Sequence, residues 1–371
     1  MVLLADIAYI GVFYMKNRIL QARRGFSMVE CAAVVLVLSM VGMTMAPSLK
    51  AVRSSMRGTA SSANLQQIGF GGAMYAGANG GRLFGYSWRA GEAYVMPNGS
   101  TRISSTDLNA SQYQNQEILQ RWTGRTSGQF KIALGVGRIP HRRFSHLVLQ
   151  DFLGYSAVDT RFIDPADANQ FVWKSNPLDY GFESTVPYAN GMPDGYDTDT
   201  SWSNRSARER WAFGSSYQVV PSAWQSDQPG ARYVPVASTP HLFTGGPNIN
   251  LHSGRNLAEV SMPGQKVWMF EEFDREGKGS PYFGYDHAQA EKLMFDGSVN
   301  SWASGDARPA IVLEYGNTPW VQIYVPLDTF PVPLGGLGDP TLVHQRYRWT
   351  FRGLKGFDYG LGVRDGGLGR R

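Results

Sequence analysis

The sequence predicts an α+β protein, in which one long N-terminal helix precedes a large, mainly antiparallel, β-rich domain. From Phe26 to Leu49 the only charged residue is Glu30, and apolar side chains would cover every face of a helix there. Beyond residue 83 the chain combines low charge with abundant Gly, Pro, Trp and Tyr and with short apolar runs, which is typical of strands joined by turns. At 371 residues the chain can bury a sizeable core.

The apolar segment has the length of a membrane span. As a helix, residues 26–49 would measure roughly 36 Å at about 1.5 Å per residue, and a hydrocarbon core is about 30 Å thick. Four basic residues precede the segment: Lys16, Arg18, Arg23 and Arg24. By the positive-inside rule they place the N-terminus in the cytoplasm and the main domain outside. We therefore expect a single-pass protein of the inner (cytoplasmic) membrane, with residues 26–48 as its transmembrane helix.

Other interpretations of this segment are a buried helix of a soluble protein and a cleaved secretory signal. The apolar residues on every face disfavour the first. A secretory signal needs small residues at its end, which Met45-Ala46-Pro47 matches poorly. A lipoprotein signal is excluded because Glu30, not a small residue, precedes Cys31.

The helix is expected to continue beyond the membrane as an amphipathic helix over residues 49–83. Apolar residues recur there in a loose helical stripe, comprising Leu49, Val52, Met56, Leu65, Ile68 and Tyr75. Pro47 removes one backbone donor and predicts a kink near the membrane surface. Glycines between Gly77 and Gly81 are expected to end the helix.

The residues at the head of the segment resemble a known processing signal. Residues 25–30 read Gly25-Phe26-Ser27-Met28-Val29-Glu30, which is similar to the cleavage site of type IV prepilins. The resemblance implies a pilin-like fold, cleavage after Gly25 by a prepilin peptidase, N-methylation of Phe26 and subunit assembly through Phe26 and Glu30. It also implies that the leader lies within residues 1–25 and that its translation starts at Met15.

The match continues with Asn64-Leu65-Gln66-Gln67-Ile68-Gly69 and with residues 73–76 and 79–83, which resemble the pilin-like proteins of planctomycete-type bacteria. That family carries a His, nine residues and then Asp-Gly. Here eight residues separate His287 from Asp296-Gly297, one fewer than the pattern. We interpret this motif as a structural hairpin over residues 292–302, in which Asp-Gly forms a two-residue turn and His287 tethers the approach.

Further elements are expected in the domain, over residues 84–340. A helix is predicted from Asp107, as its cap, to Trp122. The candidate strands are residues 130–134, 233–236, 266–270, 311–313 and 321–325. Residues 341–371 are basic and Gly-rich and are expected to form a flexible tail.

Charge and motifs exclude several functions. The net charge of +5 comes from the leader and the tail, so the main body presents no basic surface for nucleic acid. Cys31 is the only cysteine, which excludes an intrachain disulfide. Asp194, Asp197 and Asp199 are spaced as in a calcium loop, but Arg205 stands where an EF-hand has Glu, so a polar turn without a metal is the alternative. His141-Arg142-Arg143 and His146 are interpreted as a solvated loop.

The sequence therefore predicts a structural, non-enzymatic subunit, without a required cofactor, of a type II secretion or type IV pilus-like system. Its expected partners are prepilin peptidase, other pilin-like subunits and the membrane. A membrane-tethered module that binds a glycan or a protein is the alternative. An exported enzyme is disfavoured because the chain contains no recognisable nucleophile–base, metal or phosphate-binding motif.

Overall fold

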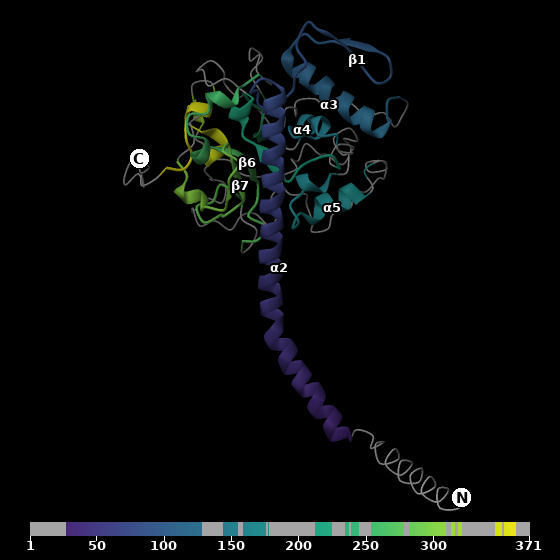
Figure 1. Cartoon of the computed structure of the whole chain (residues 1–371), viewed down its shortest axis with the longest axis vertical. Helices are drawn as coiled ribbons and strands as arrows, with labels where there is room; N and C mark the ends of the chain where they lie inside the picture. Colours follow the sequence, from purple (N-terminus) through teal and green to yellow (C-terminus); the bar gives the residue numbers. More distant parts are fainter. Residues whose placement is uncertain are drawn as a thin grey trace, which may run out of the picture. The chain divides into compact units, whose positions relative to one another are not determined.

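The computed structural model describes residues 27–127, 144–154, 159–175, 177, 212–224, 234–236, 239–244, 254–277, 282–308, 313–315, 318–320, 346–350 and 352–360. The chain divides into two compact units, Met1–Ser55 and Met56–Arg371. One helix, α2 (Met28–Ala78), contributes residues to both units (Figure 1). Helix and antiparallel sheet together place the protein in the α+β class, as the sequence predicts.

The first unit is represented by the N-terminal part of α2. Its large apolar side chains are exposed, and those of Leu36, Val37 and Leu38 are more than half exposed. The helix passes through Pro47 without ending there, although the proline lacks the N–H of one intrahelical bond. Among the described residues, α2 is the one helix long and apolar enough to span a membrane.

In the second unit, α2 becomes a core element. Leu65 and Ile68 are buried in the main hydrophobic core, and glycines let neighbouring elements approach the helix backbone closely. A Cβ atom added to Gly69 would lie 2.8 Å from Leu293 Cδ1, and one added to Gly71 would lie 2.8 Å from Leu153 Cδ1. The glycines that weaken this helix in isolation are thus its points of closest packing.

The helix ends at Ala78, within the glycine-rich stretch over residues 77–81 that is predicted to end it and before residue 83, the expected limit of the amphipathic segment. Gly80 and Gly81 adopt positive φ angles of 63° and 81°, which glycine alone adopts readily. The N–H of Gly81 donates to the carbonyl of Ala76 at 2.7 Å and satisfies a carbonyl of the last turn. Residues 79–83 therefore form the exit from the helix.

The main sheet has the order β3-β6-β7-β8, with all neighbours antiparallel. Its strands are β3 (Tyr217–Val219), β6 (Val267–Glu271), β7 (Lys292–Met294) and β8 (Val299–Asn300). In the part of the chain that the structure describes, there are also three two-stranded sheets: β1 (Ala93–Val95) with β2 (Thr101–Ile103), β4 (Val234–Val236) with β5 (Thr239–Thr244), and β9 (Leu313–Tyr315) with β10 (Thr318–Trp320).

The predicted strands over 233–236 and 266–270 correspond to β4 and β6, and β9 begins at the last residue of the prediction over 311–313. The predictions over 130–134 and 321–325 lie outside the described residues.

The described residues of the domain form three further α-helices: α3 (Asp107–Thr123), α4 (Leu147–Phe152) and α5 (Ala168–Ser175). In Figure 1 they lie on the opposite side of α2 from β6 and β7. The helix cap predicted at Asp107 is wrong by one residue: Thr106 is the N-cap, and its hydroxyl accepts the N–H of Asn109. Asp107 instead accepts the N–H of Ala90 at 2.8 Å, so it fixes the preceding loop.

The prediction of a flexible tail over residues 341–371 is wrong for its described part. Residues 346–350 and 352–360 are not a flexible tail, because Tyr347, Leu354 and Tyr359 are buried in the main core. The N–H of Asp358 donates to the carbonyl of Gln265 at 2.9 Å, and the carbonyl of Asp358 accepts the N–H of Arg308 at 2.8 Å. The basic and glycine residues predicted a solvated end, but the tyrosines between them bury this segment in the core.

Candidate functional site

The head of α2 carries a capping box formed by Ser27 and Glu30. The N–H of Ser27 donates to Glu30 Oε2 at 2.8 Å, and the N–H of Glu30 donates to Ser27 Oγ at 3.2 Å. This reciprocal pair satisfies two backbone donors that a helix start leaves without partners. The spacing Ser-x-x-Glu is visible in the sequence, but the capping box was not among the sequence predictions. Glu30 therefore has a partner within its own chain.

Several predicted site residues lie outside the described part of the chain. They are Gly25 and Phe26 of the processing signal and the calcium candidates Asp194, Asp197 and Asp199. Among the residues that the structure does describe, no three His, Cys, Asp or Glu side chains are grouped to hold a metal ion.

The predicted hairpin is formed by β7 and β8, but its turn differs from the prediction. The N–H of Met294 donates to the carbonyl of Ser298 and the N–H of Gly297 to that of Met294, so three residues form the loop. Only Gly297 has a positive φ, of 85°, whereas a two-residue turn of the predicted kind needs two. The arrangement is a turn followed by a left-handed glycine.

Asp296 and His287 have separate environments. The carboxylate of Asp296 accepts the N–H and the hydroxyl of Ser298 at 2.9 and 2.7 Å, so it stabilises its own turn. His287 is exposed, and its ring lies 5.8 Å from that of Tyr285. His146, expected in a solvated loop, is instead buried against Phe162 with the ring centres 4.7 Å apart.

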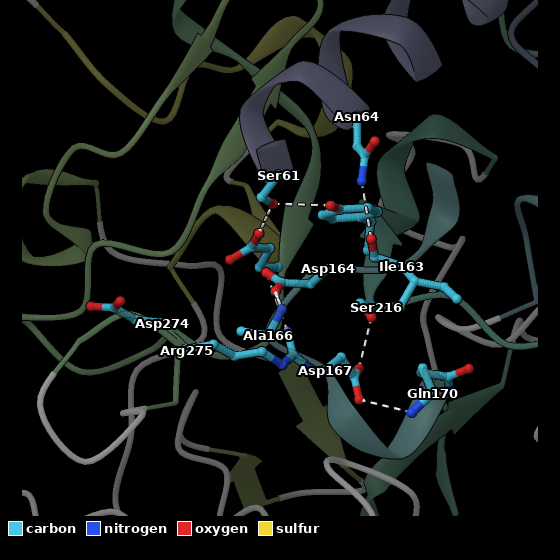
Figure 2. A network of polar contacts seen from close by, with 12 residues as sticks. Ser61, Asn64, Ile163, Asp164, Ala166, Asp167, Gln170, Ser216, Asp274 and Arg275 are labelled. Carbon is cyan, nitrogen blue, oxygen red and sulfur yellow. Dashed lines mark hydrogen bonds and ion pairs between the residues drawn. The ribbon is translucent and has the colours of Figure 1, made fainter. Parts of the chain in front are cut away.

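The most developed polar arrangement lies where α2 packs on the sheet of its domain (Figure 2). Ser61 Oγ lies 2.9 Å from the hydroxyl of Tyr217 in β3 and donates to Glu271 at the end of β6. One turn further along α2, Asn64 Nδ2 donates to the carbonyl of Ile163 at 3.1 Å. Ser61 is 2% exposed, Tyr217 0% and Glu271 3%, so the contacts of Ser61 with Tyr217 and Glu271 are shielded from water.

The segment between residues 163 and 170 supplies two more carboxylates to this arrangement. Asp164 Oδ1 accepts the N–H of Ala166 at 2.5 Å. Asp167 Oδ1 accepts the N–H of Gln170 at 3.1 Å, and its Oδ2 accepts the hydroxyl of Ser216 at 2.7 Å. Backbone donors thus hold both carboxylates in place. We call Ser61, Asp164, Asp167, Tyr217, Glu271 and Arg275 the polar clamp.

The polar clamp contains more carboxyl groups than cations: Asp164, Asp167 and Glu271 stand against Arg275. Arg275 Nη2 lies 3.0 Å from Asp167 Oδ2, and Arg275 Nη1 lies 4.0 Å from Asp164 Oδ2. Burial raises the pKa of Glu271 well above its ordinary range, and the neighbouring carboxylate of Asp164 raises it further; Arg275 and Ser61 oppose this shift. Burial also raises the pKa of Tyr217 well above its usual value. Burial and the neighbouring Asp164 thus favour the protonated form of Glu271.

A second buried polar group ties the C-terminal segment to β6. Lys266 Nζ lies 2.9 Å from Asp358 Oδ2, and the side chains are 0% and 2% exposed. The same carboxylate oxygen accepts the N–H of Val267 at 2.9 Å, and Asp358 Oδ1 accepts the hydroxyl of Thr350 at 2.5 Å. Such a fully hydrogen-bonded ion pair fixes the geometry of the groups around it.

Lys292 lies on the face of the sheet opposite α2. Its ammonium donates to the carbonyl of Ala290 and lies 5.5 Å from the ring centre of Tyr347. Burial lowers the pKa of Lys292 to about 8, although the carboxylates of Glu291, Glu271 and Asp274 oppose the shift.

No family model, curated protein or solved structure matches the chain. The functional assignment therefore depends on the residues and contacts described above.

Proposed function

We propose that the chain is a pilin-like structural subunit of a type II secretion or type IV pilus-like system, anchored by α2 and processed after Gly25. The observation that carries this proposal is the continuity of α2. A single helix, Met28–Ala78, contains both the apolar segment of membrane-spanning length and the buried core residues Leu65 and Ile68. The helix that carries the apolar segment thus also contributes residues to the hydrophobic core of the domain.

This continuity bears on where the chain is cut. A secretory signal ending near Met45–Pro47 would be cleaved in the middle of α2 and would remove the helix start with its capping box. A cut after Gly25 precedes Met28 and leaves the whole helix, including the reciprocal bonds of Ser27 and Glu30. The geometry therefore favours prepilin-type processing over an ordinary secretory signal.

The exposed apolar surface supports membrane anchoring. The large apolar side chains between Met28 and Leu49, among them Leu36, Met43 and Met45, are exposed, and an apolar surface of this size needs a membrane or a partner to cover it. We propose that α2 crosses the cytoplasmic membrane once, with the domain on the outer side, as the basic residues before Gly25 indicate.

Mass spectrometry of the N-terminal peptide of the mature protein tests the proposal. We expect a chain that begins with methylated Phe26, and we expect Gly25→Leu to remain uncut in the membrane fraction. Gly42→Leu is the matched control, because a Cβ atom on Gly42 would meet no other atom within 4 Å; this variant should be processed normally. A mature N-terminus beyond Pro47 would show an ordinary secreted protein instead.

Assembly is a separate question. We expect the mature chain to sediment with other pilin-like subunits in a filament or a membrane-bound complex. A mature, correctly processed chain that stays monomeric and binds a glycan or a protein would favour the tethered binding module.

A further inference from the structure

Within the second unit, Lys266 and Asp358 lie where β6 meets the C-terminal segment. The N–H groups of Asp358 and Tyr359 both donate to the carbonyl of Gln265, at 2.9 and 3.1 Å. These bonds hold the backbone of Asp358 beside the residue that precedes Lys266, and Lys266 Nζ lies 2.9 Å from Asp358 Oδ2. Backbone hydrogen bonds, and not charge alone, therefore bring the two side chains together.

This pair of side chains is closed to solvent. The side chain of Lys266 is 0% exposed and that of Asp358 is 2% exposed, and Thr350, which contacts both of them, is 6% exposed. A medium of low dielectric makes charged groups more costly relative to neutral ones. An amine beside a carboxylic acid is therefore more accessible here than in water, and a buried amine is a nucleophile.

Two further contacts distinguish the oxygen atoms of the Asp358 carboxylate. Oδ2 accepts the N–H of Val267 at 2.9 Å, a distance at which a backbone donor can stabilise a developing oxyanion. Oδ1 accepts the hydroxyl of Thr350 at 2.5 Å, and the same hydroxyl oxygen is in contact with Lys266 Nζ. The hydroxyl thus connects the lysine nitrogen to the second carboxylate oxygen.

We propose that Lys266 and Asp358 form an intramolecular isopeptide bond after the domain has folded. Lys266 Nζ attacks Cγ of Asp358, and negative charge develops on Oδ2 beside the N–H of Val267. Two protons pass from the nitrogen through the hydroxyl of Thr350 to Oδ1, the Cγ–Oδ1 bond breaks, and this oxygen leaves as water. An ammonium and a carboxylate thus become one amide and one water molecule, and atoms and charge balance without a co-reactant.

The folded domain supplies the driving force and gives the bond a role. Groups held in a reactive geometry reach effective concentrations of about 10⁵–10⁸ M, which favours a condensation that free side chains do not undergo. The bond would hold the C-terminal segment on β6 and constrain the unfolded chain as a disulfide does, in a sequence whose only cysteine, Cys31, excludes an intrachain disulfide. It does not depend on the function proposed above, because it joins two parts of one domain.

Mass spectrometry of the full-length protein, purified in detergent micelles and shown to be folded by circular dichroism, tests the bond. We expect the chain to be lighter by one water molecule than the mass calculated for its termini. Trypsin should not cleave after Lys266, and fragmentation should identify one branched peptide that joins Lys266 to Asp358. A folded wild-type chain of full mass that is cleaved after Lys266 would refute the bond, and so would a loss of water without the branched peptide.

Three variants test the roles of the side chains. Lys266→Arg keeps a cation beside Asp358 but cannot form the amide, so it should have full mass. Thr350→Val removes the hydroxyl, and we expect the branched peptide to appear about a hundredfold more slowly after pulse labelling; a wild-type rate would overturn the role given to Thr350. Lys292→Met is the matched control, because Lys292 is also buried but donates to the carbonyl of Ala290. It should lose water as the wild type does, and a folded Lys292→Met chain of full mass would contradict the assignment to Lys266.

Discussion

The indole of Trp268 fills the space beside Gly72: a Cβ atom on Gly72 would lie 2.3 Å from Trp268 Cη2. Trp268 is 3% exposed and stacks on Phe295 with the ring centres 5.1 Å apart, so it cannot move aside. The absence of a side chain at Gly72 thus allows α2 to approach β6. This contact is where the helix that carries the anchor is packed into the domain.

We expect Gly72→Ala to lower the free energy of unfolding of the domain by about 1–3 kcal/mol, because overpacking of the core outweighs the better helix propensity of alanine. Thermal unfolding followed by circular dichroism measures the change. Gly77→Ala is the control, since Gly77 also lies in α2 but has no atom within 4 Å of an added Cβ. It should raise stability by up to about 1 kcal/mol, and similar effects of both variants would contradict the proposed packing.

The sequence predicts the elements that have a local pattern. The apolar run predicts α2, the capping signal at Asp107 predicts α3 to within one residue of its true N-cap, and the Asp296-Gly297 pair predicts the β7–β8 hairpin. The polar clamp has no such pattern, because Ser61, Asp164 and Glu271 are separated by about a hundred residues each. Only the packing of α2 on the sheet brings them together. No spacing rule could have identified them.

The C-terminal segment was predicted wrongly for a related reason. Its basic and glycine residues suggested a solvated chain, whereas Tyr347 and Tyr359 bind it to the core. Burial of Asp358 beside Lys266 is a pairing across the sequence, and composition cannot predict it.

We expect Asp358→Ala to lower the free energy of unfolding by about 3–5 kcal/mol, because the ammonium of Lys266 would remain buried without its carboxylate. Chemical denaturation measures the loss. Glu117→Ala provides the comparison, as Glu117 pairs with Arg121 at 2.7 Å, where the arginine side chain is 45% exposed. That pair should contribute about 0.5 kcal/mol. A small effect of Asp358→Ala would mean that residues 346–360 are not part of the core.

Burial of Lys292 makes the stability of the domain depend on pH. Its pKa is about 8 in the folded protein and about 10.5 when exposed, so the unfolded chain binds more protons between these values. Stability from this group is fully present above about pH 10.5 and is lost as the pH falls through about 8. The difference in stability between wild type and Lys292→Met should therefore change by about 3 kcal/mol between pH 7 and pH 11.

Denaturation at several pH values measures that difference. Lys355→Met is the control, because Lys355 is exposed, and its difference from the wild type should stay constant with pH. A constant difference for Lys292→Met as well would mean that the ammonium of Lys292 is solvated.

Glu30 can act in two ways, and its contacts allow them to be separated. Its carboxylate caps α2 through Ser27, and under the proposed function it also pairs with the N-terminal amine of Phe26 on a neighbouring subunit. A charge within a membrane span is unfavourable, by about 2.5–3.5 kcal/mol at the centre and less near the end, so a second, cationic partner would stabilise it. Glutamine can replace glutamate in a capping box but carries no charge.

We therefore expect Glu30→Gln and Glu30→Ala to be inserted and cleaved normally, and both to assemble poorly in crosslinking between anchor helices. Ser27→Ala removes the cap but keeps the carboxylate, so it should assemble as the wild type does. If Glu30→Gln assembled normally while Glu30→Ala did not, the cap alone would explain the role of Glu30. If both variants assembled like the wild type, the charge would have no role in subunit contacts, and the tethered binding module would become the better account of the chain.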